Sequence, residues 1–168
     1  LTCSYDKTAR IWDAGTGVVL KRFQHDDILG QGAAFLDGTR VATTTHNGKV
    51  WLWDVESAAL LFCREGGSWG VAVTPDGQRV IATVGDGALS NRGHVQIWDA
   101  QSGELLIDIP GHDAESAYYA MSSPDGKYVV TTGEDCATRV WSIEDGSAVA
   151  CMQRDGVGWA CCFSPDGR

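Results

Sequence analysis

The sequence predicts an all-β fold in which one unit of four short strands is repeated about four times. A tryptophan ends a short run of alternating apolar residues at Trp12, Trp53, Trp98 and Trp141. These tryptophans are 41, 45 and 43 residues apart. An aspartate–glycine pair, typical of a tight turn, recurs with the same period at Asp37, Asp76, Asp125 and Asp166. Two separate marks with one period of about 40–45 residues indicate a repeat architecture.

The fourth repeat shows the elements of the unit in order. Its expected strands cover residues 117–122, 127–132, 138–141 and 148–152. The first turn is Ser123-Pro124-Asp125-Gly126, where proline fixes φ and glycine accepts a positive φ. The second strand is rich in β-branched residues and tyrosine, which favour extended structure. Residues 133–136 and 144–146 supply the remaining two turns.

Four short strands per period, without helical periodicity, predict one four-stranded antiparallel sheet for each repeat. Such sheets, repeated around an axis, form a β-propeller whose sheets are its blades. The chain begins within the second strand of a repeat and stops at the turn that leads into such a strand. We therefore expect about four repeats, with one blade split between the two termini.

The motifs resemble the WD-repeat (tryptophan–aspartate repeat) β-propeller family along the whole chain. In the fourth repeat the family pattern reads Gly111-His112, Ser123-Pro124-Asp125-Gly126, Thr131, Asp135 and Trp141. The resemblance implies a hydrogen-bonded relay of His112, Thr131, Asp135 and Trp141 within the blade. Such a relay gives buried polar groups their partners, and each bond contributes on the order of 1 kcal/mol.

The other repeats carry this relay less completely. The first repeat has Thr2, Asp6 and Trp12. The second has His25, Thr43, Asn47 and Trp53, with asparagine as a weaker acceptor than aspartate. The third keeps Thr83 and Trp98, but Gly66-Gly67 stands where glycine–histidine is expected. We therefore expect no relay in the third repeat.

Family propellers most often have seven blades and sometimes eight. The resemblance therefore implies that residues 1–168 are a WD-repeat segment of four repeats from a seven- or eight-bladed propeller. The remaining blades of the parent propeller would then cover the exposed sheet faces. Self-association of two copies into an eight-bladed ring is the alternative.

An enzymatic function is not expected, although Ser or Thr, His and Asp also form hydrolase triads. The constellation recurs with the repeat, whereas a catalytic triad should occur once. No Gly-x-Ser-x-Gly elbow, phosphate-binding glycine loop or His-Glu-x-x-His motif accompanies it. Six cysteines show neither a C-x-x-C pair nor zinc spacing, so we expect no metal and no cofactor. Cysteines of this kind suit a reducing compartment, which favours an intracellular, cytoplasmic protein.

The charged residues indicate one candidate binding face of the propeller. This face is built by the loops before each innermost strand and by the turns before each tryptophan strand. Its ten expected acids are Asp6, Asp26, Asp27, Glu65, Asp86, Asp113, Glu115, Glu134, Asp135 and Asp155. Its five expected bases are Lys7, Lys49, Arg64, Arg92 and Arg154, which leaves about −5 of the net charge of −9. An acidic face repels nucleic-acid phosphates and attracts basic protein segments. A surface kept acidic only for solubility is the alternative.

Three aromatic residues occupy one position, six residues before a turn proline: Trp69, Tyr118 and Trp159. They would lie near the start of each innermost strand, where aromatic rings can anchor a peptide. Packing between blades is the alternative explanation. The third repeat also inserts residues 86–93, which form either part of a binding face or a tolerated loop.

These observations predict a non-catalytic scaffold that docks a protein or peptide, with a basic segment as the preferred ligand. The expected contact residues are Trp69, Tyr118, Trp159, Asp26, Asp113, Glu115 and Asp155. The alternative is a sensor or regulatory propeller segment of a larger multidomain signalling protein or enzyme. Nucleic-acid and membrane partners are not expected, because the face is acidic and no apolar run approaches the ~20 residues that span a bilayer.

Overall fold

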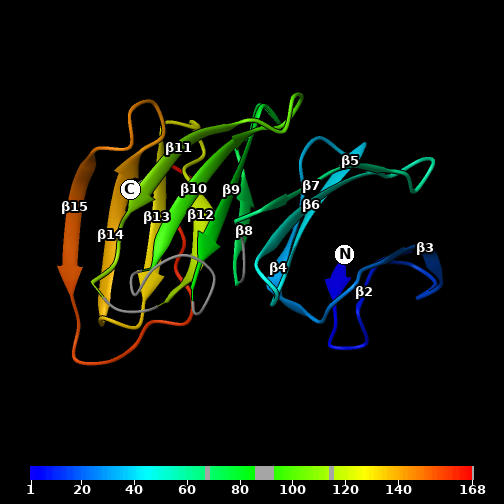
Figure 1. Ribbon diagram of the computed structural model, residues 1–168, viewed down its shortest axis with the longest axis horizontal. Coiled ribbons are helices and arrows are strands. Elements are labelled where there is room, and N and C mark those ends of the chain that lie inside the picture. Colours follow the sequence, from blue (N-terminus) through cyan, green and yellow to red (C-terminus); the bar gives the residue numbers. More distant parts are fainter. Residues whose placement is uncertain (67–68, 86–92, 114–115, 168) are drawn as a thin grey trace.

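The computed structural model describes residues 1–66, 69–85, 93–113 and 116–167, without the side chain of residue 31. Its strands form four antiparallel sheets, which confirms the expected all-β fold (Figure 1). The inserted residues 86–92 lie outside the described part of the chain. Among the described residues, no helix is long and apolar enough to cross a membrane.

Each sheet is one blade, with its strands in chain order. The first blade contains β1 (Thr2–Cys3), β2 (Thr8–Trp12) and β3 (Val19–Gln24). The second contains β4 (Leu29–Phe35), β5 (Arg40–Thr45), β6 (Lys49–Asp54) and β7 (Leu60–Glu65). The third contains β8 (Val71–Val73), β9 (Arg79–Val84), β10 (His94–Asp99) and β11 (Leu105–Pro110). The fourth contains β12 (Ala117–Ser122), β13 (Tyr128–Gly133), β14 (Ala137–Ser142) and β15 (Ala148–Gln153).

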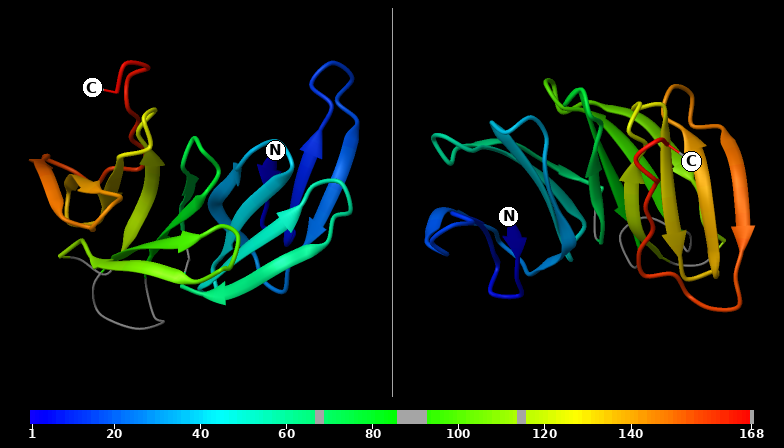
Figure 2. Two further views of the ribbon diagram at one scale, coloured as in Figure 1. Left: turned by 90° about the horizontal axis from the view of Figure 1, so that it is seen from above. Right: turned by 180° about the vertical axis from the view of Figure 1, so that it is seen from behind.

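The four blades lie side by side in an open arc, with the first and fourth blades at its two ends (Figures 1 and 2). The innermost strands β4, β8 and β12 contact one another in sequence, and β1 contacts β4. The inner ends of successive blades are therefore neighbours, so side chains from several blades can meet there.

The aspartate–glycine turns close by side-chain capping. In the fourth blade the Gly126 N–H donates to the Ser123 carbonyl at 3.0 Å, and the Asp125 carboxylate accepts the Lys127 N–H at 3.1 Å. Gly126 has φ +71°, a conformation that glycine adopts without strain. This chemistry recurs because each repeat must turn from its innermost strand into the next strand.

The aspartate that follows three of the four tryptophans caps the turn into the outermost strand. Asp54 accepts the Ser57 N–H at 2.8 Å, and Asp99 accepts the Ser102 N–H at 2.7 Å. Just before each tryptophan the pairing with the outermost strand shifts register. The shift is a β-bulge, which bends the strand and increases its local twist.

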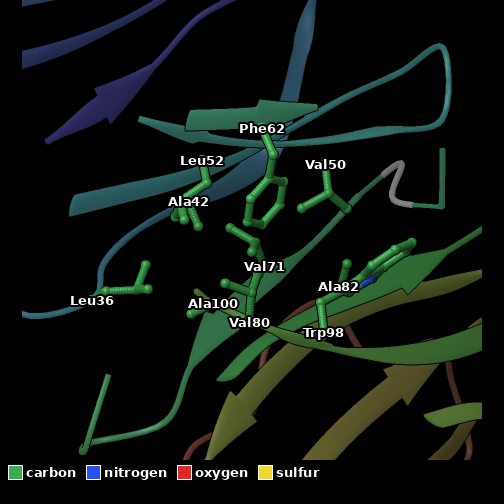
Figure 3. Close-up of a cluster of buried hydrophobic side chains, with 10 residues drawn as sticks. All are labelled: Leu36, Ala42, Val50, Leu52, Phe62, Val71, Val80, Ala82, Trp98 and Ala100. Carbon is green, nitrogen blue, oxygen red and sulfur yellow. The ribbon is translucent and has the colours of Figure 1, made fainter. Parts of the chain in front are cut away.

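The hydrophobic core lies between blades, because the facing surfaces of neighbouring sheets bury apolar side chains against each other. Between the second and third blades, Phe62, Val71 and Trp98 belong to one buried cluster (Figure 3). A similar cluster joins the third and fourth blades, and another joins the first and second. Trp53, Trp98 and Trp141 each face the preceding blade and are buried, as the sequence predicts.

The expectation that Trp12 is buried was wrong, since its side chain is 38% exposed. The first blade lies at one end of the arc (Figure 1). Its packed residues Ala9, Ile11 and Phe23 face the second blade. The face that carries Trp12 points away from the second blade, and no sheet in the described part of the chain covers it.

The split blade is present as two pieces that are not joined. The first blade lacks the innermost strand that the other three blades have. Residues 157–163, which have the sequence pattern of an innermost strand, contain no assigned strand. They lie against the fourth blade, where the Trp159 ring stacks on Tyr118 and the Cys161 thiol lies 3.7 Å from the Val130 carbonyl oxygen.

Candidate functional site

The fourth blade brings together His112, Thr131, Asp135 and Trp141. The imidazole lies between a carboxylate and a hydroxyl: Nδ1 is 2.9 Å from Asp135 Oδ1, and Nε2 is 2.9 Å from Thr131 Oγ1. The Trp141 indole N–H donates to the same Thr131 oxygen at 2.9 Å. One consistent hydrogen-bond chain follows, from the indole through the hydroxyl and the imidazole to the carboxylate.

Burial and hydrogen bonding fix the charges of this relay. Burial lowers the pKa of His112 and outweighs the opposite effect of the nearby Asp135 carboxylate, so the imidazole is neutral at pH 7. Burial alone would raise the pKa of Asp135, but hydrogen bonds from His112 and Arg139 hold that pKa below its usual range. His112 is only 1% exposed and Thr131 is fully buried, so a substrate has no access to the histidine–hydroxyl pair.

The second blade has a shorter relay than expected. His25 Nε2 lies 2.8 Å from Thr43 Oγ1, and the Trp53 indole N–H donates to that oxygen at 3.2 Å. The expectation that Asn47 replaces the aspartate was wrong, because its amide group bonds Thr45 and Asp26 instead. His25 Nδ1 is therefore buried without a partner among the described residues.

The first blade holds part of a relay in a more exposed position. The Trp12 indole N–H donates to Thr2 Oγ1 at 2.8 Å. The Asp6 carboxylate accepts the Thr8 N–H at 3.0 Å and pairs with Arg10 at 2.5 Å. Hydrogen bonds from Thr8 and Arg10 lower the pKa of Asp6 to about 2.

Among the described residues the third blade shows no relay, as expected, but for an additional reason. Ala82 pairs with Gln96 as Thr131 pairs with Arg139, so Ala82 occupies the relay position and has no hydroxyl. The Trp98 indole nitrogen has no partner among the described residues. The assignment of Thr83 to the relay was wrong by one residue, and its hydroxyl accepts the Gly70 N–H instead. Counting six residues on from each turn aspartate would have found Ala82.

An aromatic row crosses the inner ends of the blades. We define it as Tyr5, His46, Trp69, Tyr118 and Trp159. Successive ring centroids along it are 5.9, 4.4, 5.6 and 5.1 Å apart. All neighbours meet edge to face except Tyr118 and Trp159, which stack with an angle of 15° between the ring planes. The two end members, Tyr5 and Trp159, are 69% and 60% exposed.

Sequence reasoning found three members of this row and missed Tyr5 and His46. Tyr5 lies in the turn between β1 and β2, and His46 lies in the turn between β5 and β6. Each follows the relay threonine of its blade, Thr2 or Thr43, by three residues. This shared position could have identified both residues, but the residue types at that position differ between the repeats.

The acids of the candidate face are mostly paired with bases of the same face. The Asp26 carboxylate binds the Lys49 ammonium, and Asp113 lies 3.1 Å from the Arg139 guanidinium. Arg139 also binds Asp135, which lies four residues earlier in the chain. Arg10 and Arg139 were not expected on this face, because they lie two residues before a tryptophan within a strand. Their long side chains reach the turn carboxylates and make the face less negative than the count of acids suggests.

The other expected contact residues differ in their surroundings. Asp155 is exposed and has no ion pair within the described part of the chain. Glu115 lies outside the described residues. Trp51 lies two residues before Trp53 in the same strand, β6, with the two rings stacked at 5.6 Å, and fills space between the first and second blades.

The opposite face of the propeller carries the aspartate–glycine turns and contains a groove. A groove of about 270 Å³ lies between the third and fourth blades, and its lining includes Asp76, Arg79 and Tyr128. The Arg79 guanidinium crosses the blade boundary to the Ile143 carbonyl at 2.7 Å. Asp76 therefore serves as a marker for this face in experiments.

Comparison with known proteins gives one family. The model described as "WD domain, G-beta repeat" matches residues 1–13 and 103–142. These residues hold β1 and β2 of the first blade, β11 of the third blade and β12, β13 and β14 of the fourth blade. Both segments contain a repeat tryptophan, Trp12 in β2 and Trp141 in β14.

Curated relatives carry the same repeat in their names or match nearly the whole chain. The human WD repeat and SOCS box-containing protein 1 is 33% identical over 79 residues, which is 45% of this chain and 18% of that protein. Autophagy-related protein 16 from Arabidopsis thaliana is 24% identical over 96% of the chain and 32% of its own length. Target of rapamycin complex subunit wat1 from Schizosaccharomyces pombe is 24% identical over 87% of the chain and 48% of its own length. The chain therefore spans less than half of each of these relatives. Its motifs, its blades and these matches are all similar to those of the WD-repeat family, which is the family that the comparisons support.

Proposed function

We propose that this chain is a non-catalytic interaction scaffold that docks a protein segment on its candidate face. The aromatic row carries the proposal, because it joins side chains from all four blades into one surface at the inner ends of the sheets. Aromatic rings supply large contact areas and are common anchors in protein interfaces. A surface that spans several blades suits an extended segment.

The preferred ligand is a segment that combines a basic side chain with an apolar one. Exposed rings such as Trp159 can take the apolar part and can also face a guanidinium or ammonium group. Acids at the rim, Asp155 and Asp113 among them, would steer a basic segment toward the rings. Because Asp113 already binds Arg139, steering by this acid is modest and decreases with salt.

The relatives support a role in protein assemblies. One of them is named as a subunit of the target of rapamycin complex, and another combines WD repeats with a SOCS box in its name. The second candidate function, a regulatory propeller segment of a larger multidomain protein, takes its support from names of that kind. We also place the protein inside the cell, in the cytoplasm. All six cysteines are free thiols, which suits a reducing compartment.

The test selects peptides from a random display library on the wild-type chain and titrates the strongest binder. Trp69→Ala is expected to weaken that binding about 10-fold or more, because an anchor ring is lost. Asp113→Lys should weaken it less, and the effect should fade as salt is raised. Asp76→Lys, on the opposite turns, is the matched control and should leave binding unchanged.

Two results would count against the proposal. Selected peptides without basic residues would remove the preference for a basic segment and leave the aromatic anchor. A peptide whose binding is lost in Asp76→Lys and kept in Trp69→Ala would place the site on the opposite face. Circular dichroism of each variant shows whether it is folded before it is titrated.

A further inference from the structure

At the boundary between the third and fourth blades, the imidazole of His112 packs among polar side chains of the fourth blade. Its Nδ1 atom lies 2.9 Å from the Arg139 guanidinium, and its Nε2 atom lies 2.9 Å from the Thr131 hydroxyl. The same hydroxyl accepts the Trp141 indole N–H. We call the place of this imidazole the ring position of the fourth blade.

The corresponding ring position of the third blade lacks both the imidazole and the hydroxyl. The sequence has Gly67 where the next boundary has His112, and the strand pairing places Ala82 where the fourth blade has Thr131. Ala82 and Trp98 belong to the buried cluster between the second and third blades (Figure 3). The described residues that bound this ring position are Gly66, Ala82, Gln96 and Trp98.

Two polar atoms at this ring position are buried and have no hydrogen-bond partner among the described residues. They are the Trp98 indole Nε1, which is a donor, and the Gln96 carboxamide Oε1, which is an acceptor. The two side chains are only 5% and 4% exposed, and they leave the same face of β10 because they are two residues apart. Buried polar atoms without partners are costly, so this pair suits a group that both accepts and donates.

Gly66 places this ring position directly after β7, at the end of the second blade. A Cβ atom built on Gly66 would lie 1.9 Å from Gln96 Oε1 and 2.9 Å from a ring carbon of Trp98. Both side chains therefore converge on Gly66, where only glycine fits. Trp69 of the aromatic row follows Gly66 by three residues, so the ring position adjoins the face on which we place the docked segment.

The chemistry of the ring position matches a neutral imidazole. Loss of a ring and a hydroxyl leaves room, because the neighbours of a deleted side chain relax only in part. The N–H of an imidazole would donate to Gln96 Oε1, and its second nitrogen would accept the Trp98 indole N–H. A neutral ring suits the site better than a cation, because the adjacent carboxylate, Asp108, already bonds Gln96 Nε2 and His94.

We propose that the ring position of the third blade binds the imidazole of a histidine in the docked segment. This inference rests on the proposed docking along the aromatic row, and it adds one residue type to the segment. The segment would cross the row at Trp69 and place its histidine between Gln96 and Trp98. Local opening of the fold gives small groups access to buried positions of this kind.

Free imidazole at about pH 8, where the ring is neutral, is the probe for the ring position itself. The titration is followed in proton–nitrogen NMR spectra of the indole N–H groups, and the Trp98 signal is assigned by its loss in Trp98→Phe. This signal is expected to shift with a dissociation constant in the millimolar range, as suits so small a ligand. The Trp141 signal is the control in the same sample and should not move, because His112 already fills the ring position of its blade.

Two analogues of the probe separate its two hydrogen bonds. Pyrrole keeps the ring N–H without the second nitrogen, and N-methylimidazole keeps the accepting nitrogen without the N–H. Each is expected to bind at least about 10-fold more weakly than imidazole, because one buried polar atom then stays without a partner.

Two variants of the chain test the same contacts from the protein side. Ala82→Val fills part of the ring position, and Gln96→Leu removes the acceptor. Each should weaken imidazole binding at least about 10-fold, with circular dichroism showing that the variant is folded. Gln101→Leu makes the same change as Gln96→Leu at an exposed site of the third blade and should leave binding unchanged.

Peptides selected on the wild-type chain test whether a histidine supplies the ring. The selected segment is expected to contain a histidine whose replacement by alanine weakens binding about 10-fold and abolishes the shift of the Trp98 signal. Free imidazole should compete with the histidine peptide. Trp69→Ala should still weaken binding of the alanine form, because the aromatic row holds the rest of the segment.

The outcomes separate this inference from the docking proposal. A Trp98 signal that free imidazole leaves unmoved, or equal binding of imidazole and pyrrole, would overturn the inference and leave docking intact. Selected peptides that bind without a histidine and leave the Trp98 signal unmoved would overturn it in the same way. Failure of docking itself would appear as the absence of any selected peptide, whatever the imidazole titration shows.

Discussion

His112 Nε2 lies 2.9 Å from Thr131 Oγ1, although the histidine follows the outermost strand of the third blade and the threonine lies in the second strand of the fourth. This contact joins two blades as well as two residues. The relay therefore sets how closely neighbouring sheets approach, in addition to giving buried polar groups their partners. The relay recurs in weaker forms in other blades. This recurrence indicates a structural role.

Removing the relay carboxylate should destabilise the fold. Asp135→Ala leaves the His112 Nδ1–H and the Asp113 N–H without their acceptor. We expect the free energy of unfolding to fall by about 1–3 kcal/mol, measured from urea denaturation. Glu134→Ala changes an exposed neighbour and should cost less than about 0.5 kcal/mol. Equal midpoints for the two variants would contradict a working hydrogen-bond chain.

The stability of the fold should fall as the pH is lowered from 7 toward 5. Burial lowers the pKa of His25 to about 4 in the folded chain, against about 6.5 when unfolded. Between these values the unfolded chain binds the proton and the folded chain does not, so acid favours unfolding. The expected loss from this group is about 1–2 kcal/mol between pH 7 and pH 5.

Urea denaturation at the two pH values measures this loss in the wild-type chain and two variants. His25→Gln removes the titrating group and should reduce the difference between the two pH values. Thr43→Val removes the hydrogen bond but keeps the imidazole, so it should lower stability at both pH values and keep most of the difference. A difference unaffected by His25→Gln would show that other groups cause the acid sensitivity.

Much of the fold follows from local sequence. Turn chemistry at Asp125-Gly126 and the alternating pattern before Trp141 define the strands, because those features act within a few residues. Whether Trp12 is buried could not be predicted from local sequence. It depends on whether another sheet covers the blade, and an end blade has the same sequence pattern as an inner one.

The candidate site was less predictable because its contacts depend on register and on side-chain reach. Thr83 was assigned to the relay from a nearby hydroxyl, whereas the strand pairing places Ala82 there. Arg139 reaches Asp135 and Asp113 from the middle of a strand, which counting charges along loops does not reveal. His46 joins the aromatic row only because neighbouring blades bring the row together.

The relay position of the third blade can be tested by adding the missing hydroxyl. Ala82 faces the buried Trp98 indole N–H, which has no partner among the described residues. Threonine and valine have nearly the same shape, so the comparison of Ala82→Thr with Ala82→Val isolates the hydrogen bond. We expect the threonine variant to be more stable by about 0.5–1.5 kcal/mol in urea denaturation. Equal stability would mean that the indole cannot reach the added oxygen.

Two tryptophans near the fourth blade should have different roles. Replacing Trp141 should lower stability, whereas replacing Trp159 should mainly weaken binding. Trp141 is 6% exposed and packs against the third blade, so Trp141→Ala should cost about 3–5 kcal/mol. Trp159 is 60% exposed and stacks on Tyr118, so Trp159→Ala should cost about 1 kcal/mol or less. The same change removes an exposed ring of the aromatic row and should weaken binding of the selected peptide about 10-fold. If Trp159→Ala lowered stability as much as Trp141→Ala, the ring would belong to the core, and its assignment as a binding residue would fail.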